Sequence, residues 1–179
     1  MAYKYTQGSV RRGDIYNEDD TQSNTYLDWS EDAIGVIAGG STVFVVSGST
    51  AQVGIGTTSP VSTFEVSGSQ GGNYTQAAGS ITFTETHFVV DYTGNGDATF
   101  TLPAPSGVTG RVYYVVSHAQ GATDALTVTS SGDATTFQGP NVEGGSQANV
   151  AIDGNTPQSL HLISTGADWF ILHDGRSAH

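Results

Sequence analysis

The chain has 179 residues, of which 17 are acidic and 5 basic, so its formal net charge is −12. This balance excludes a nucleic-acid or anionic-membrane partner, because both are held mainly by basic side chains. The chain contains no cysteine and only 12% charged residues but 24 glycines. Disulfides and thiolate metal sites are therefore excluded, and the composition favours strands and turns over helices.

The first segment, residues 1–24, contains three of the five basic side chains, Lys4, Arg11 and Arg12. It contains no apolar run at its start, so we expect no signal peptide and synthesis in a cytoplasm without export. We interpret the segment as an N-terminal attachment arm onto an acidic surface. The alternative is a poorly ordered terminus without a partner.

Residues 25–73 are predicted to form a stem of short strands. Apolar runs at 25–29, 33–38, 42–46, 53–55 and 63–66 are each bounded by Gly, Ser, Asn or Pro, which is typical of β structure. Segments 42–49 and 62–69 are identical at five of eight positions. Such a short repeat, with one strand and one sharp turn, is typical of solenoid and fibre-like stalks.

The predicted stem strands carry few large apolar side chains, so one chain alone would bury little surface with them. Open strand edges also pair readily with other chains. We therefore expect an oligomer in which several copies bury these side chains together, although this argument does not set the number of copies. The predicted interface residues are Val43, Phe44, Val46, Val53, Ile55, Phe64 and Val66.

Residues 67–79 are predicted to be a linker, and the domain that follows, residues 74–179, is predicted to be a β-sandwich head. Its expected strands are 80–83, 87–92, 98–102, 111–117, 125–129, 147–152, 159–164 and 169–173, spaced as in a sandwich or barrel. The Asn95-Gly96 pair predicts a hairpin between the strands that flank it. Very little helix is expected.

Catalytic and metal-binding patterns are sparse. No two of the five histidines stand four residues apart, and no Gly-x-Ser-x-Gly element occurs, so we expect no enzyme and no cofactor. The acidic residues between Asp14 and Asp32, and the loop from Asp91 to Asp97, are weak calcium candidates. The alternatives are a solvated acidic face and an ordinary turn. The aromatic residues Trp29, Tyr113, Tyr114, Trp169 and Phe170 could stack on sugars or pack in a core.

One motif carries a resemblance to a known class. The segment Val53-Gly54-Ile55-Gly56-Thr57-Thr58-Ser59-Pro60, followed by Phe64-Glu65-Val66-Ser67-Gly68, resembles the "VGIGTTxP…LxVxG" signature of phage tail fibres, tailspikes and other virion appendages. Residues 20–40 resemble the segment that precedes this motif in cyanophage-like structural proteins. Residues 99–103, 110–114 and 168–172 resemble parts of their β-sandwich heads.

The resemblance implies an all-β homotrimer with an intertwined stem and a small, jelly-roll-like head. It further implies a virion protein on the capsid exterior, a decoration (cement) protein that binds the major capsid protein. The residues expected to make that contact are Tyr3, Tyr5, Arg11, Arg12, Ile15 and Tyr16. An alternative within the same class is a short tail or head fibre that binds a host-surface glycan. A third, a glycan-processing enzyme, has no recognisable carboxylate pair.

Overall fold

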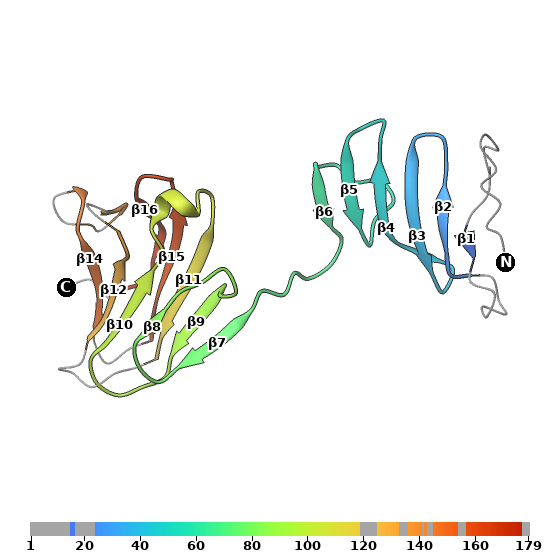
Figure 1. The fold of residues 1–179 in the computed structure, drawn as a ribbon. Helices are drawn as coiled ribbons and strands as arrows, with labels where there is room; N and C mark the ends of the chain where they lie inside the picture. The colour runs from blue at the N-terminus through green and yellow to red at the C-terminus, as the bar shows by residue number, and fades with distance from the viewer. Residues whose placement is uncertain are drawn as a thin grey trace, which may run out of the picture. The chain divides into compact units, whose positions relative to one another are not determined.

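The computed structural model describes residues 15–16, 24–118, 125–132, 136–140, 142, 145–153 and 157–176. The chain divides into two compact units, Met1–Gly71 and Gly72–His179, which we call the stem and the head (Figure 1). The predicted all-β fold class is confirmed. In the described parts of the chain, the only helical element is a 3₁₀ turn, η1 (Pro105–Gly107). No helix there is long and apolar enough to cross a membrane.

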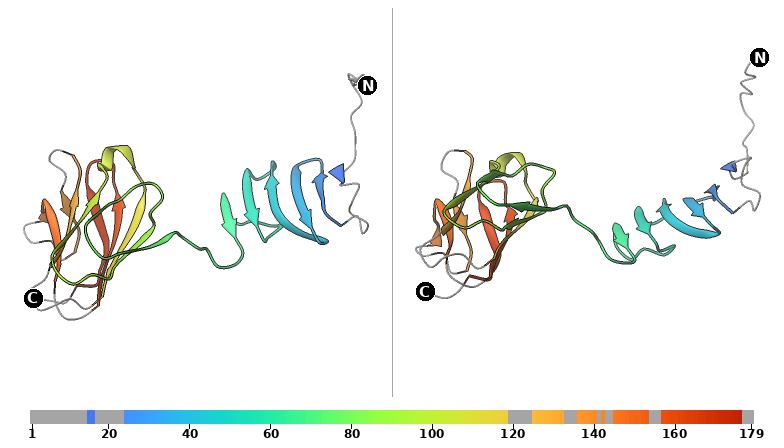
Figure 2. Two further views of the ribbon diagram at one scale, coloured as in Figure 1. Left: turned by 60° about the horizontal axis from the view of Figure 1, so that its bottom comes forward. Right: turned by 90° about the horizontal axis from the view of Figure 1, so that it is seen from below.

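The stem is a single layer of strands that follow one another in chain order (Figures 1 and 2). Its strands are β1 (Ile15–Tyr16), β2 (Tyr26–Trp29), β3 (Ala33–Ala38), β4 (Ser41–Ser47), β5 (Gln52–Ile55) and β6 (Phe64–Val66). Neighbours from β1 to β5 are antiparallel, whereas β5 and β6 are parallel. Strands β2 to β6 coincide with the five predicted runs.

The connection from β5 to β6 crosses one face of this sheet, because adjacent parallel strands cannot be joined by a tight hairpin. Gly54 makes room for it: a Cβ atom at this position would lie 2.7 Å from the carbonyl oxygen of Thr57 and 3.0 Å from Val45 Cγ1. Gly56 begins the crossover with a φ of +70°, and Pro60 within it is buried. The crossover therefore covers one face and leaves the other open.

The repeated segments form β4 and β6, which lie on either side of β5. Since β4 is antiparallel and β6 parallel to β5, the two copies run in opposite directions. The repeat is therefore not the translational unit of a solenoid.

The head is a β-sandwich of two mixed sheets (Figure 1). The first has the order β14-β12-β10-β8, and the second has the order β13-β16-β15-β11-β9-β7. Their bounds are β7 (Tyr74–Ala77), β8 (Ile81–Thr82), β9 (Val89–Tyr92), β10 (Ala98–Leu102), β11 (Val112–Ser117), β12 (Ala125–Ser130), β13 (Phe137–Gln138), β14 (Asn149–Asp153), β15 (Gln158–Ser164) and β16 (Trp169–Asp174). Five ladders are parallel, unlike the antiparallel ladders of a jelly roll.

The core of the head lies between the two sheets, where alternate residues of facing strands are fully buried. Phe100 from the smaller sheet and Tyr113 from the larger both contact Phe83, with ring centroids 5.7 and 5.1 Å apart. Trp169 is 0% exposed, and its indole nitrogen donates a 3.1 Å hydrogen bond to the carbonyl oxygen of Pro103.

Two predictions about the head are wrong. The Asn95-Gly96 turn is not a hairpin, because β9 and β10 belong to different sheets. The turn instead carries the chain across the sandwich, and Tyr92 Oη closes it by donating to the carbonyl oxygen of Gly96 at 2.7 Å. The predicted linker, residues 67–79, contains β7, which pairs with β9. The boundary between stem and head follows Gly71, whereas the sequence placed it at residues 73 and 74.

Phe100→Ala is expected to destabilise the head by about 3–5 kcal/mol, because it opens a cavity in a fully packed core. Thr99→Ala, one residue away on the exposed face of β10, is expected to change stability by less than about 0.5 kcal/mol. Urea unfolding followed by the fluorescence of Trp169, in a Trp29→Phe background, measures both. Equal effects of the two variants would contradict the assignment of this core.

Candidate subunit interface

Cross-strand register places the apolar residues of the stem on one face. One row crosses the sheet from Trp29 through Ile34, Val46 and Val53 to Phe64. The second row runs parallel to it, two residues away on every strand, and contains Leu27, Val36, Phe44, Ile55 and Val66. Since residues i and i+2 of a strand share a face, the ten side chains form one surface, which we call the apolar stem face.

No described element of the stem covers the apolar stem face. Trp29 is 50% exposed, Phe64 55%, Ile55 39% and Ile34 37%, and the other six side chains are half-buried. The opposite face differs: Ile37 and Val45 are only 7% and 8% exposed. Full burial of an apolar side chain of this size contributes about 1.5–3 kcal/mol. Leaving ten such side chains partly exposed to water is therefore costly.

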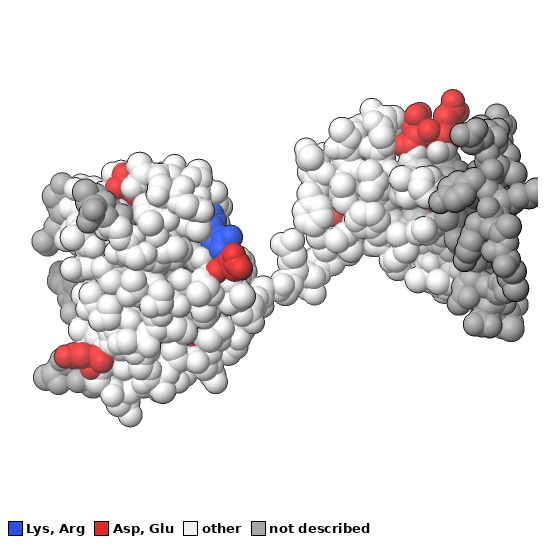
Figure 3. Space-filling view, viewed as in Figure 1, with Lys and Arg blue, Asp and Glu red and all other residues white. Residues whose placement is uncertain are grey.

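Charge is also distributed unequally between the two faces. Asp28 and Glu65 lie in the row Asp28–Gly35–Val45–Gly54–Glu65, on the face that the crossover covers. Neither apolar row contains a charged residue. Figure 3 shows a surface that is largely uncharged in this view, with acidic side chains gathered at one end of the stem. Depletion of charge is characteristic of interface cores.

Six of the seven predicted interface residues belong to the apolar stem face. The seventh, Val43, lies at the irregularity between β3 and β4, where Val36 pairs with Phe44 and Ile37 pairs with Thr42. Val43 therefore has no register partner in β3 or β5, although its carbonyl oxygen accepts a 3.0 Å hydrogen bond from the backbone nitrogen of Gly56, and it is in neither row. Sequence reasoning missed Leu27, Trp29, Ile34 and Val36. Alternation within β2 and β3 was the signal that could have identified them.

The predicted capsid-contact residues lie at the start of the chain. Tyr3, Tyr5, Arg11 and Arg12 are outside the described residues. Ile15 and Tyr16 form β1, whose backbone pairs with Leu27 and Tyr26 of β2. The end of the predicted attachment arm is thus part of the stem sheet.

The aromatic candidates divide between the core and the surface. Tyr113 and Trp169 are 0% exposed core residues. Trp29 and Phe170 are 50% and 38% exposed, so core packing was the wrong interpretation for these two. Tyr114 is half-buried on the outer side of the larger head sheet.

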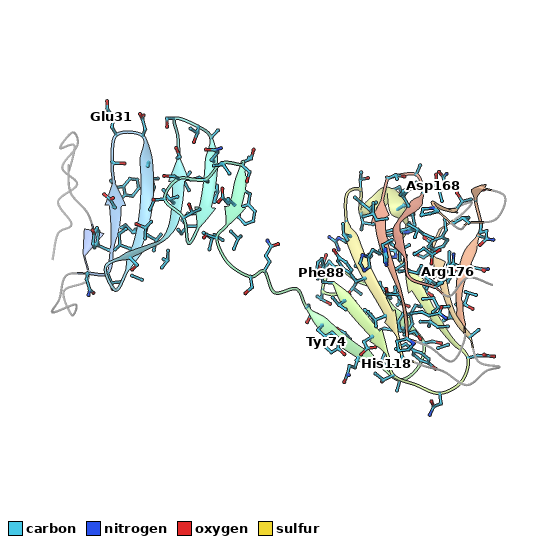
Figure 4. The ribbon with its side chains drawn as sticks, turned by 180° about the vertical axis from the view of Figure 1, so that it is seen from behind. Glu31, Tyr74, Phe88, His118, Asp168 and Arg176 are labelled. Atoms are coloured by element: carbon cyan, nitrogen blue, oxygen red, sulfur yellow. The ribbon has the colours of Figure 1, made fainter. Side chains whose placement is uncertain are left out.

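A cluster of polar side chains around the buried carboxylate of Asp91 holds β7 against β9, its neighbour in the larger head sheet. Tyr74 Oη donates to Asp91 Oδ2, and His118 Nδ1 lies 2.9 Å from Asp91 Oδ1. Gln76 Nε2 donates to Tyr74 Oη at 3.1 Å. The hydrogen bond to Asp91, followed by burial, raises the pKa of Tyr74 above its ordinary value. Tyr74 and His118 are labelled in Figure 4.

A second carboxylate, Asp168, holds β13 against β16. Its Oδ1 accepts hydrogen bonds from the backbone nitrogen and Oγ1 of Thr136, at 3.2 and 2.5 Å. Its Oδ2 accepts one from Gln138 Nε2 at 2.9 Å. Like the Asp91 cluster, this arrangement joins strands.

The calcium candidates are not assembled into a metal site within the described ranges. Asp91 is bonded within its own cluster, and Asp97 Oδ1 accepts a 3.0 Å hydrogen bond from the backbone nitrogen of Ala125. Asp14, Glu18, Asp19 and Asp20 lie outside the described residues. Across the residues that are described, no group of three or more His, Cys, Asp or Glu side chains could hold a metal ion.

A row of rings crosses the outer side of the larger head sheet. His161 on β15 pairs with His173 on β16, and their ring centroids are 4.9 Å apart. The Tyr114 ring lies 4.5 Å from His161 on the other side. Burial, and then the neighbouring His173, lower the pKa of His161 below its ordinary value.

This lowered pKa predicts a head that is less stable in acid. The unfolded chain binds more protons than the folded chain as the pH falls below about 6.5, so this contribution to stability is present above that pH and is lost below it. Urea midpoints at pH 7.5 and 5.0 measure the loss, which His161→Gln is expected to reduce. An equal loss in the wild type and in His161→Gln would contradict the assignment.

The largest candidate functional feature of the described chain is thus the apolar stem face, whose chemistry suits contact with protein. Comparisons with protein-family models, with curated proteins and with solved structures found no match to this chain.

Proposed function

We propose that this chain is a homotrimeric structural protein of a bacteriophage particle, which decorates the capsid exterior and stabilises the assembled head. The single observation that carries the proposal is the uncovered apolar stem face. Contiguous exposed apolar surface on this scale marks an interaction site on a soluble protein. Copies of the same chain are the partner that is always available, and each brings an identical face.

The area of the apolar stem face is a substantial part of a stable interface, but it is too small to hold two stems together by itself. Strands spaced about 4.8 Å apart, with four or five residues rising about 3.3 Å each, give it a planar area of about 400 Å². A stable interface commonly buries about 800 Å² per partner. Three sheets that turn their apolar faces to a shared axis would bury all of them together. The number three comes from the motif resemblance.

The residues that carry this resemblance are the ones that build the face. Val53 and Ile55 contribute to its two rows. Gly54 and Gly56 admit the crossover, and Pro60 is buried within it. Five positions of the motif therefore have a structural role in producing a sheet with one covered and one open face, and this link supports assignment to the virion appendage class.

The proposed mechanism is mechanical and involves no catalysis. The arm, residues 1–24, would lie across neighbouring major capsid proteins and contact them through Tyr3, Tyr5, Arg11, Arg12, Ile15 and Tyr16. Because β1 lies within the arm and pairs with β2, capsid contact and stem association are joined through one sheet. Buried interface area would then hold adjacent capsid subunits against internal pressure.

Phe64→Glu is expected to dissociate the trimer, because it places an unpaired charge in the apolar contact. Val61→Glu is the matched control: Val61 is 87% exposed and lies in the crossover, outside both rows. Analytical ultracentrifugation should give about three times the 18.5 kDa chain mass for wild type and for Val61→Glu. Phe64→Glu should raise the dissociation constant by at least about a hundredfold, which corresponds to a few kcal/mol.

A monomeric wild type at micromolar concentration would overturn the proposed homotrimer. Equal masses for all three proteins would show instead that the chain associates through another surface. Far-ultraviolet circular dichroism, which reports the strand content of the whole chain, checks that both variants remain folded.

The copy number in purified particles tests the capsid role. A decoration protein is expected at an abundance comparable to that of the major capsid protein, measured by quantitative peptide counting. A few copies per particle would contradict decoration and favour the short fibre, with a host-surface glycan as its ligand.

A further inference from the structure

The outer side of the larger head sheet is a second uncovered surface. Its inward residues belong to the core, whereas no described element of the head forms a second layer over the alternating outward residues. We call the surface formed by Tyr114, His161, Ile163, Phe170, Leu172 and His173 the head face. Val112 pairs with Ile163, and Ile163 pairs with Phe170, so this row is apolar. Leu172 is 54% exposed and Phe170 38%.

None of the six head-face residues is an acid, a lysine or an arginine. The carboxylates that border this surface already have partners: Asp91 on β9 is 2% exposed and contacts Tyr74 and His118, Asp168 accepts from Gln138, and Asp174 is paired with Arg176. Aromatic side chains without accompanying charge are enriched in the buried core of protein–protein interfaces. The head face therefore has the composition of a protein contact.

We propose that the head face packs against the heads of other copies of this chain, so that the oligomer is held together at its heads as well as at its stems. This inference rests on the proposed function for the association of the stems. The head face and the apolar stem face would then contact the same partner, namely other copies of this chain.

Area is the first argument for a second copy as the occupant. The three strands β16, β15 and β11, spaced about 4.8 Å apart with about six residues each, give the head face a planar area of about 300 Å². The apolar stem face has a planar area of about 400 Å². Each alone falls short of the roughly 600–1,000 Å² per partner of a typical stable interface, whereas together, at about 700 Å², they fall within this range.

The length of the linker is the second argument. Ser67 N donates the last stem hydrogen bond, 2.8 Å, to the carbonyl oxygen of Ile55. Gly72 already packs on the head, because a Cβ atom there would overlap the Phe88 ring. The four residues 68–71 between these contacts span about 15 Å at full extension. Such a short tether gives linked domains an effective concentration in the millimolar range, at which even a weak head contact is occupied.

The orientation of the rings favours a second copy over a saccharide. Phe88 and Tyr114 pack edge to face with centroids 5.0 Å apart and an interplanar angle of 63°. Tyr114 and His161 do the same at 4.5 Å and 65°. In each pair one ring face is covered by its neighbour, whereas stacking on a sugar needs an open ring face. Phe88 is labelled in Figure 4.

Cysteine cross-linking of the full chain tests the inference, because the native sequence has no cysteine. Leu172→Cys places a single thiol on the head face. Thr99→Cys places one on the exposed side of β10, in the other sheet. With a short bis-maleimide, Leu172→Cys is expected to yield covalent dimers at least tenfold in excess of Thr99→Cys. The yield should not depend on protein concentration, and adding Phe64→Glu should reduce it.

The outcomes separate this inference from the proposed function. If ultracentrifugation shows trimers but neither Leu172→Cys nor a second variant, Ile163→Cys, cross-links above the control, the head contact is overturned and the stem association stands. If the wild type is monomeric, both are overturned. Binding of a purified host polysaccharide that Phe170→Glu abolishes, without cross-linking, would assign the head face to a glycan and overturn the inference.

Discussion

Burial of one face of a single-layer sheet is the constraint on which the rest of this molecule depends. A strand directs alternate side chains to opposite faces, so the apolar residues of β2 to β6 gather on one side wherever the register is maintained. The crossover between β5 and β6 covers the other side. No described element of the stem covers the apolar rows, and the proposed association with other copies of the chain would bury them.

The stem and the head differ in how far each can bury its apolar side chains without a partner. The head has a continuous core between two sheets, with Phe100, Tyr113 and Trp169 all 0% exposed, and it does not need a partner to bury these residues. Among the described residues of the stem, the buried apolar side chains are those of Ile37, Val45 and Pro60. With the proposed association, the stability of the stem would depend on protein concentration, as it does for an obligate oligomer.

Hydrogen bonds from polar side chains hold neighbouring strands of the head together. Asp91 joins Tyr74 of β7 to the end of β11, and Asp168 joins the short strand β13 to β16. Each carboxylate is positioned by donors from other strands, which makes short edge strands part of the sandwich. Such contacts suit a protein whose proposed role is to remain rigid under load.

The sequence by itself determined the strand content, the positions of most strands and six residues of the apolar stem face. These follow from alternation and from Gly, Ser and Pro at strand ends, which are local properties. Only the tertiary structure decided how the strands pair. The observed register places Trp29 and Ile34 on the apolar stem face and leaves Val43 outside its two rows. The strands on either side of Asn95-Gly96 belong to different sheets. The physical reason is that pairing is set by contacts between residues far apart in the chain, and a turn signal specifies a change of direction but not the partner of the strand that follows.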